Sequence, residues 1–182
     1  MHATTKPASV GSSAVSLAID LAKDVFELAF ADASGRIVER KRLMAASGVG
    51  LITATALSAG IGDFARFPSG RHFASALGLT PREYSSGGTR KLGRITKQGD
   101  VFLRTLLIHG ARSALIVAAT ARKRGQPLDR TQQWALALAE RKGHNKAVVA
   151  LANKTARRLW AAEHHGVGFD PDHLSQREQR AG

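Results

Sequence analysis

The spacing of apolar residues changes near Leu43, and this change restricts the fold more than any other feature of the sequence. Before it, "VSLAIDLA", "VFELAFA" and "IVERKRL" are short apolar runs separated by turn residues, a pattern typical of β-strands. After it, apolar residues recur at helical spacing. We therefore expect an α+β chain, with a small three-stranded antiparallel sheet followed by an all-α helical domain.

The predicted boundaries follow from the same pattern. We expect a disordered tail over residues 1–13, the strands within 14–43, the helical domain over 47–165 and a polar tail over 166–182. Helices are predicted at about 51–59, within 68–79, over 100–124 and at 128–142, and the last one starts with Asn145 as N-cap. The long helix should have a broad apolar side that includes Phe102, Leu106, His109, Ser113, Ile116 and Val117.

The charge of the chain is strongly positive and unevenly distributed. Residues 1–43 hold six basic and five acidic side chains. The remaining 21 basic and nine acidic side chains lie in residues 44–182, which therefore carry a net charge of +12. A surplus of this size favours a polyanionic partner. There are no cysteines, which excludes disulfides and thiolate metal sites, and no apolar run approaches the ~20 residues of a membrane span. We expect a cytoplasmic protein with no membrane partner.

The glycine pair in "GVG", Gly48 and Gly50, precedes an apolar helical segment. Glycines at a helix start let backbone N–H groups approach a phosphate, as in a helix-hairpin-helix turn. A helix–helix turn without a ligand explains the same three residues, and from them alone it is the favoured interpretation.

Asp20 lies midway along an apolar run, in "AIDLAKD". A carboxylate there is costly unless it is paired or holds a metal, so Asp20 is either a satisfied core acid or a metal ligand.

The stretch "EYSSGGTRKLGRITKQGD", residues 83–100, joins two serines to a dense group of cations. We expect a loop, because Gly87, Gly88, Gly93 and Gly99 lie close together. A serine there could attack a DNA phosphate while Arg and Lys neutralise the developing charge. On chemistry alone, an ordinary solvated Ser/Gly turn is the simpler explanation.

Three blocks together resemble the IS110 family of transposases, closest to its IS1111 branch: "AIDLAKDVFELAFAD", the long block from "GVGLITATAL" to "LLIHGARS", and "NKAVVALANKTARRLWA". The resemblance covers nearly everything from Val15 to Pro171. It implies a ribonuclease-H-type (RuvC-like) N-terminal domain whose Asp-Glu-Asp-Asp set binds Mg²⁺, and a helical C-terminal domain whose serine becomes joined to DNA. It also implies a structured guide RNA.

On this resemblance, Asp20 matches the first acid and therefore the metal ligand, and Ser86 matches the nucleophile. The expected DNA contacts are Gly48, Gly50, Ser85, Arg90, Lys91, Arg94 and Lys97. Further expected partners are a second copy of the chain or an intact transposase, and DNA-bound protein would associate with the bacterial nucleoid.

The sequence departs from the family pattern between "RIVERKRL" and "GVGLITATAL". The family normally has more than a hundred residues there, with the remaining acids and a coiled-coil insertion, whereas here the two blocks join at about Leu43 to Ala46. Ser47 also stands where the family usually has proline. We interpret the chain as an internally deleted transposase, its sheet a remnant of the ribonuclease-H-like domain.

Three functions remain open. The chain is a DNA-binding transposase with an incomplete catalytic site, a stand-alone basic nucleic-acid-binding module that interferes with intact transposase, or a recombinase completed by another protomer's acids.

Binding to nucleic acid should depend strongly on salt. If several phosphates are contacted, affinity should fall by orders of magnitude between about 50 and 200 mM salt, because each contact releases counterions. Joint replacement of Arg90, Lys91, Arg94 and Lys97 by Ala should flatten the slope of log affinity against log salt, measured by fluorescence anisotropy. Binding that does not change with salt would contradict an electrostatic interface.

Overall fold

A computed structural model of the chain describes three groups of residues. They are the backbone of three strands at 16–21, 26–31 and 37–41, then 46–89 and 91–166, and finally 169, 170 and 172. The tail predicted at 1–13 lies outside the described residues, as does most of the tail predicted at 166–182.

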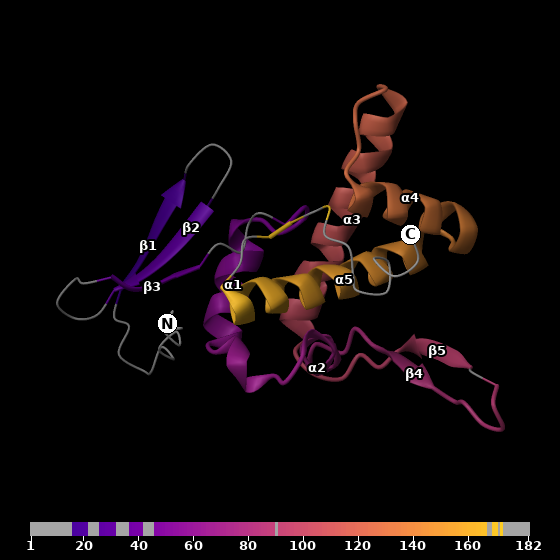
Figure 1. The fold of residues 1–182 in the computed structure, drawn as a ribbon, viewed down its shortest axis with the longest axis horizontal. Coiled ribbons are helices and arrows are strands. Elements are labelled where there is room, and N and C mark those ends of the chain that lie inside the picture. The colour runs from indigo at the N-terminus through magenta and orange to yellow at the C-terminus, as the bar shows by residue number, and fades with distance from the viewer. Residues whose placement is uncertain are drawn as a thin grey trace, which may run out of the picture.

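The N-terminal strands are β1 (Ser16–Leu21), β2 (Phe26–Ala31) and β3 (Ile37–Lys41). They pair antiparallel in the order β1-β2-β3 (Figure 1). The β1–β2 register places Asp20 opposite Glu27, and the β2–β3 register shifts between Phe30 and Ala31. The short apolar runs of the sequence thus form the strands.

Helices make up most of the remaining described chain: α1 (Leu51–Ile61), the 3₁₀ turn η2 (Phe64–Arg66), α2 (Gly70–Ala76), α3 (Val101–Lys123), α4 (Arg130–Lys142) and α5 (His144–His165). Helix α5 lies at the centre of this group and contacts α2, α3, α4 and η2 (Figure 1). The helical domain predicted from the spacing is therefore present.

The core of the helical part is built from small aliphatic side chains and a few aromatic ones. Its fully buried large residues include Leu57, Phe73, Leu107, Val148 and Leu159. Buried alanines on α3, α4 and α5 let the helix backbones approach closely, as the scarcity of aromatic residues suggests. Trp160 is only 8% exposed, and its indole N–H donates to the carbonyls of Phe64 and Phe67, which fixes η2 on α5.

The start of α5 differs from the prediction. Gly143, at φ 89°, ends α4 and begins α5, so Asn145 lies inside the helix and is not its N-cap. Side-chain caps begin the two preceding helices instead: Asp100 accepts from the Leu103 N–H, and Asp129 forms a capping box with Gln132. A glycine with positive φ turns the chain sharply between α4 and α5.

The stretch predicted to be a loop contains a two-stranded antiparallel sheet, so that prediction was wrong, as was the expectation of an all-α domain. Strand β4 (Pro81–Glu83) pairs with β5 (Leu92–Ile95), and this hairpin extends away from the helices (Figure 1). The glycines that suggested a loop lie at the turn, within β5 and beyond its end. Only Gly93 lies within a strand, so the glycines do not prevent hydrogen-bonded pairing of β4 with β5.

The buried face of α3 also differs from the face that the sequence analysis singled out. Phe102 is 61% exposed and Val117 60%, and His109 is exposed as well. The residues that pack into the core lie on the other side of the helix: Leu103, Leu107, Ala111, Leu115 and Ala118. Because α3 is apolar around most of its circumference, spacing alone does not select the buried face.

By length and composition α3 could cross a membrane, contrary to the expectation that no segment could. Its packing accounts for the same composition. One side of α3 lies against α1, α4 and α5, and the helix carries a buried Arg104 and two basic residues in its last turn. The core helix of a soluble protein can have the same length and apolar composition, so α3 is weak evidence for a membrane span.

A direct backbone contact joins the segment before α1 to the middle of α3. A Cβ on Gly110 would lie 1.8 Å from the Gly48 carbonyl oxygen, and a Cβ on Gly48 would lie 2.3 Å from that of Gly110. Both distances are far inside van der Waals contact. Glycine at both positions therefore allows α3 to pack against the turn that leads into α1.

Replacing Gly110 by Ala should destabilise the protein by about 1–3 kcal/mol, because the added methyl overpacks this contact. Alanine is intrinsically the better helix former by about 1 kcal/mol, so the sign of the effect is diagnostic. Gly60→Ala in α1 is the control, since its Cβ would meet only the movable Leu103 Cδ1 at 3.3 Å. Urea denaturation measures both changes, and a more stable Gly110→Ala protein would refute the contact.

Candidate functional site

The tip of the β4–β5 hairpin is a tight turn that presents Ser86. The Ser86 N–H donates to the Thr89 carbonyl at 3.3 Å, and the Thr89 N–H donates to the Ser86 carbonyl at 3.0 Å. Between them Gly87 and Gly88 have φ of 57° and 80°, the positive pair that a type I′ turn requires. This turn is the reason for the Ser-Gly-Gly sequence, and all four residues are exposed.

The two adjacent serines have different surroundings. The Ser85 hydroxyl donates to Glu83 Oε1 at 2.6 Å and accepts the Lys91 N–H at 3.3 Å, so it links the two sides of the hairpin. The Ser86 hydroxyl forms no hydrogen bond with any described residue. Ser85 therefore contributes to the hairpin structure and has a carboxylate partner, whereas the Ser86 hydroxyl is free to meet a ligand.

Exposed cationic side chains lie along the hairpin and at its root: Arg82, Lys91, Arg94 and Lys97. Of the four predicted cations, Lys91 and Arg94 lie on the hairpin, Lys97 lies just beyond β5, and Arg90 lies outside the described residues. A narrow arm with this charge can neutralise a polyanion at close range.

The root of the hairpin is fixed to α2 and α3 by the buried side chain of Arg104, which is 7% exposed. Its guanidinium donates to the carbonyls of Leu77, Gln98 and Asp100 at 3.2 to 3.4 Å. The N–H groups of Lys97 and Thr96 donate to the carbonyls of Gly78 and Thr80. A Cβ on Gly99 would lie 1.8 Å from the Ala76 carbonyl oxygen, so this crossing admits no side chain there.

The glycines of "GVG" occupy different environments. Gly48 lies against the backbone of α3, so packing alone is sufficient reason for a glycine there. Gly50 precedes α1 as an exposed N-cap without a side-chain hydrogen bond, and nothing lies within 4 Å of the place where its Cβ would be. An anion could approach the first turn of α1 at Gly50, but contact with DNA at either glycine stays a prediction.

The predicted metal site is not assembled by the described residues. Asp20 lies on β1, where its backbone pairs with Glu27, and the structure describes no more of it than that. Among the residues whose side chains are described, no three His, Cys, Asp or Glu groups come together to hold a metal ion. Mg²⁺ prefers near-octahedral oxygen ligation, and its binding at Asp20 stays a prediction.

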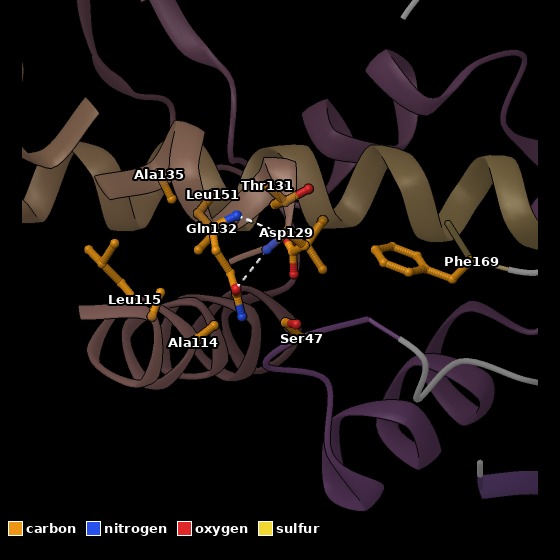
Figure 2. Close-up of a pocket in the computed structure, with 11 residues that line it drawn as sticks. Ser47, Ala114, Leu115, Asp129, Thr131, Gln132, Ala135, Leu151 and Phe169 are labelled. Carbon is orange, nitrogen blue, oxygen red and sulfur yellow. Dashed lines mark hydrogen bonds between the residues drawn. The ribbon is translucent and has the colours of Figure 1, made fainter. Parts of the chain in front are cut away.

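Two hollows lie elsewhere in the helical part. A small cavity of about 20 Å³ between α3, α4 and α5 has room for a single water, and the Asp129–Gln132 capping box lies at its edge (Figure 2). A groove of about 410 Å³ lies beside the last turns of α3 and is bordered by the Arg122–Glu140 ion pair. Neither is lined by a residue of the hairpin.

A family model described as "Transposase IS116/IS110/IS902 family" matches residues 40–126. The chain carries a transposase domain of this family. The matched segment includes the whole hairpin, its anchor Arg104 and the Gly48–Gly110 contact, whereas α4 and α5 follow it.

Named relatives agree with this assignment. A "Probable family 20 transposase" of Pseudomonas aeruginosa is 49% identical over 121 residues, which is 66% of this chain and 34% of that protein. The IS1111A transposase of Coxiella burnetii is 44% identical over 121 residues, 66% of this chain and 32% of its own. The IS1328 transposase of Yersinia enterocolitica is 36% identical over 129 residues, which is 71% of this chain and 37% of that protein. The chain thus spans about a third of the length of these transposases.

Two residues at this site were missed by the sequence analysis. Glu83 was passed over because its pairing with Ser85 depends on the conformation of the hairpin. Arg104 could have been found, because it lies beside Leu103 and Leu107 on the buried side of α3, where a charged residue is unusual. The sequence analysis followed the other side of that helix.

Replacing Arg104 by Met should lower the free energy of unfolding by about 2–4 kcal/mol, because three carbonyl oxygens lose a charged donor. The root should also open more often, which amide hydrogen exchange at Thr96 and Lys97 would report as faster exchange. Arg112→Met, on the same helix but only half-buried, is the matched control. Equal effects of the two substitutions would contradict the anchoring role of Arg104.

Proposed function

We propose that this chain is an IS110-family transposase that binds DNA through the β4–β5 hairpin and carries Ser86 as the group that attacks a phosphodiester. One observation carries the proposal: within the matched transposase segment, an exposed serine hydroxyl stands at the tip of an arm lined with arginine and lysine. Cations beside a phosphate stabilise the charge that develops on its oxygens during attack. A structured guide RNA is a proposed second partner.

Ser86 is the better candidate of the two serines for the nucleophile. Its side chain is exposed at the turn and its backbone is held by Thr89, so the hydroxyl can reach a bound strand without disrupting the hairpin. The Ser85 hydroxyl already holds Lys91 and Glu83. Its carboxylate partner could act as a base, so Ser85 is the alternative that an experiment has to exclude.

We further propose that the chain is internally deleted and does not catalyse the reaction alone. In support, only six residues separate the end of β3 at Lys41 from Gly48, and the chain spans about a third of its relatives. On this proposal the sheet β1-β2-β3 is what remains of a ribonuclease-H-like domain, and Asp20 is the one acid kept from its Mg²⁺ site. Serine is a weak nucleophile at its ordinary pKa, so attack needs help that these residues do not supply.

A second candidate function is a stand-alone nucleic-acid-binding module that competes with intact transposase. The net charge of +12 over residues 44–182 favours it, because a basic surface binds a polyanion without any catalytic group. The hairpin is held by contacts within residues 76–104, among them the Arg104 hydrogen bonds to Leu77 and Gln98. Inhibition of an intact relative by this chain, in the absence of any reaction of its own, would select this function.

The chain alone should form no covalent adduct with DNA. Purified protein is incubated with Mg²⁺, element-end DNA and the cognate RNA, and the products are separated on a denaturing gel. We expect noncovalent binding without an adduct, because the acids that should assist the serine are missing. The positive control is a full-length relative with the same substrates.

An adduct would overturn the proposed inactivity and identify the nucleophile. If it disappears in Ser86→Ala and persists in Ser85→Ala, the assignment of Ser86 is correct. If it persists in Ser86→Ala and disappears in Ser85→Ala, the nucleophile is Ser85. Adding an intact relative with its own serine replaced by Ala tests whether a partner's acids restore the reaction.

A further inference from the structure

Helices α2 and α5 meet at a close backbone contact, and each helix carries an arginine there, Arg71 on α2 and Arg157 on α5. A Cβ on Gly70 would lie 2.8 Å from the Arg157 carbonyl oxygen and 3.3 Å from the Arg157 Cβ. Arg71 is the next residue after Gly70. The junction therefore brings the backbones of Arg71 and Arg157 close together from elements that are far apart in the sequence.

The junction is fixed from both sides along α5. One turn before Arg157, Asn153 donates from Nδ2 to the Leu79 carbonyl at 3.1 Å, just beyond the end of α2. One turn after it, Trp160 donates to the carbonyls of Phe64 and Phe67. The positions of the two arginines thus follow from buried contacts and do not depend on their own side chains.

The two arginines repel each other and have no acidic partner in the described part of the chain. Partial removal from water and, second, the charge of Arg71 lower the pKa of Arg157. Neither guanidinium forms an ion pair with a described residue, yet both side chains reach solvent. By contrast Arg122, also exposed, is neutralised by Glu140 at 2.6 Å. Water screens part of the repulsion because both side chains are exposed, and an anion bound between them would remove the rest.

We propose that Arg71 and Arg157 form a phosphate clamp that binds the backbone of a nucleic acid, separately from the serine-bearing hairpin. Guanidinium groups bind phosphate oxygens through paired N–H donors, and a phosphate between two of them removes the repulsion. The inference rests on the proposed nucleic-acid binding and adds a second contact to it. Because α2 leads directly into the hairpin, the clamp fixes a strand relative to the arm that carries Ser86.

The clamp is tested by comparing two double variants of the full chain. Arg71→Gln with Arg157→Gln removes the clamp, and Arg141→Gln with Lys142→Gln removes the same charge from the exposed end of α4. Affinities for duplex DNA and for single-stranded RNA of equal length are measured by anisotropy at several salt concentrations. The clamp variant should bind about tenfold or more weakly than the control variant, with a salt slope lower by about one contact.

A lysine variant separates a clamp from general electrostatics. Arg71→Lys with Arg157→Lys keeps both charges but loses the planar pairs of donors, so its affinity should lie well below that of the wild-type chain. Full wild-type affinity in this variant would overturn the clamp. A loss of affinity for DNA alone or for RNA alone identifies which of the two backbones the clamp binds.

Thermal unfolding with inorganic phosphate provides a readout that needs no nucleic acid. At ionic strength matched with chloride, phosphate should raise the Tm of the wild-type chain and of the α4 control more than that of the clamp variant, because an anion bound to the folded state stabilises it. Equal Tm shifts, or equal affinity losses in the two double variants, would overturn the clamp and leave the proposed function standing. If the wild-type chain binds neither DNA nor RNA, the proposed function itself is overturned, and the Tm comparison then decides whether the pair binds an anion.

Discussion

The buried guanidinium of Arg104 is the interaction on which the arrangement around the serine hairpin depends. A charged group away from water is costly unless it is hydrogen-bonded, and here Nη1 donates to main-chain carbonyls from three places. Leu77 ends α2, Gln98 follows β5, and Asp100 caps α3. One side chain thus sets where the chain leaves the helical core for the hairpin and where it returns. The contacts of Arg104 with the residues on either side of the hairpin therefore help to fix where it projects from the helices.

The helices could be predicted from the sequence, because their signals are local. Apolar spacing and the glycines near positions 62 and 143 are sufficient to place α1, α4 and most of α5 within a few residues. The buried face of α3 could not be predicted in the same way. Leu103 and Leu107 face the core and Phe102 faces solvent, although all three are apolar. Only the contacts of α3 with α1, α4 and α5 distinguish them.

The hairpin and part of the candidate site lie beyond such local signals. Strand pairing between Glu83 and Leu92 is not visible in composition, and Gly87 and Gly88, which suggested a loop, form the turn that pairing requires. Ser86 and the cations could be predicted from the family resemblance, whereas the clamp residues could not. Arg71 and Arg157 are brought together only when α2 packs on α5, and no pattern in either segment indicates its partner.

The position of Ser86 has a consequence for how a complete catalytic site could form. Ser86 lies five residues beyond Pro81, the first residue of β4, which allows it to stand up to about 17 Å from the root of the hairpin, at roughly 3.3 Å per residue. A hydroxyl at that distance cannot be activated by groups inside the helical core. The described carboxylate nearest to it along the chain is Glu83, which accepts the Ser85 hydroxyl, so any further acid would have to reach the hairpin from outside the helical core. On the proposed function, the arm would supply the nucleophile and the positive charge, and acids from outside the helical core would complete the site.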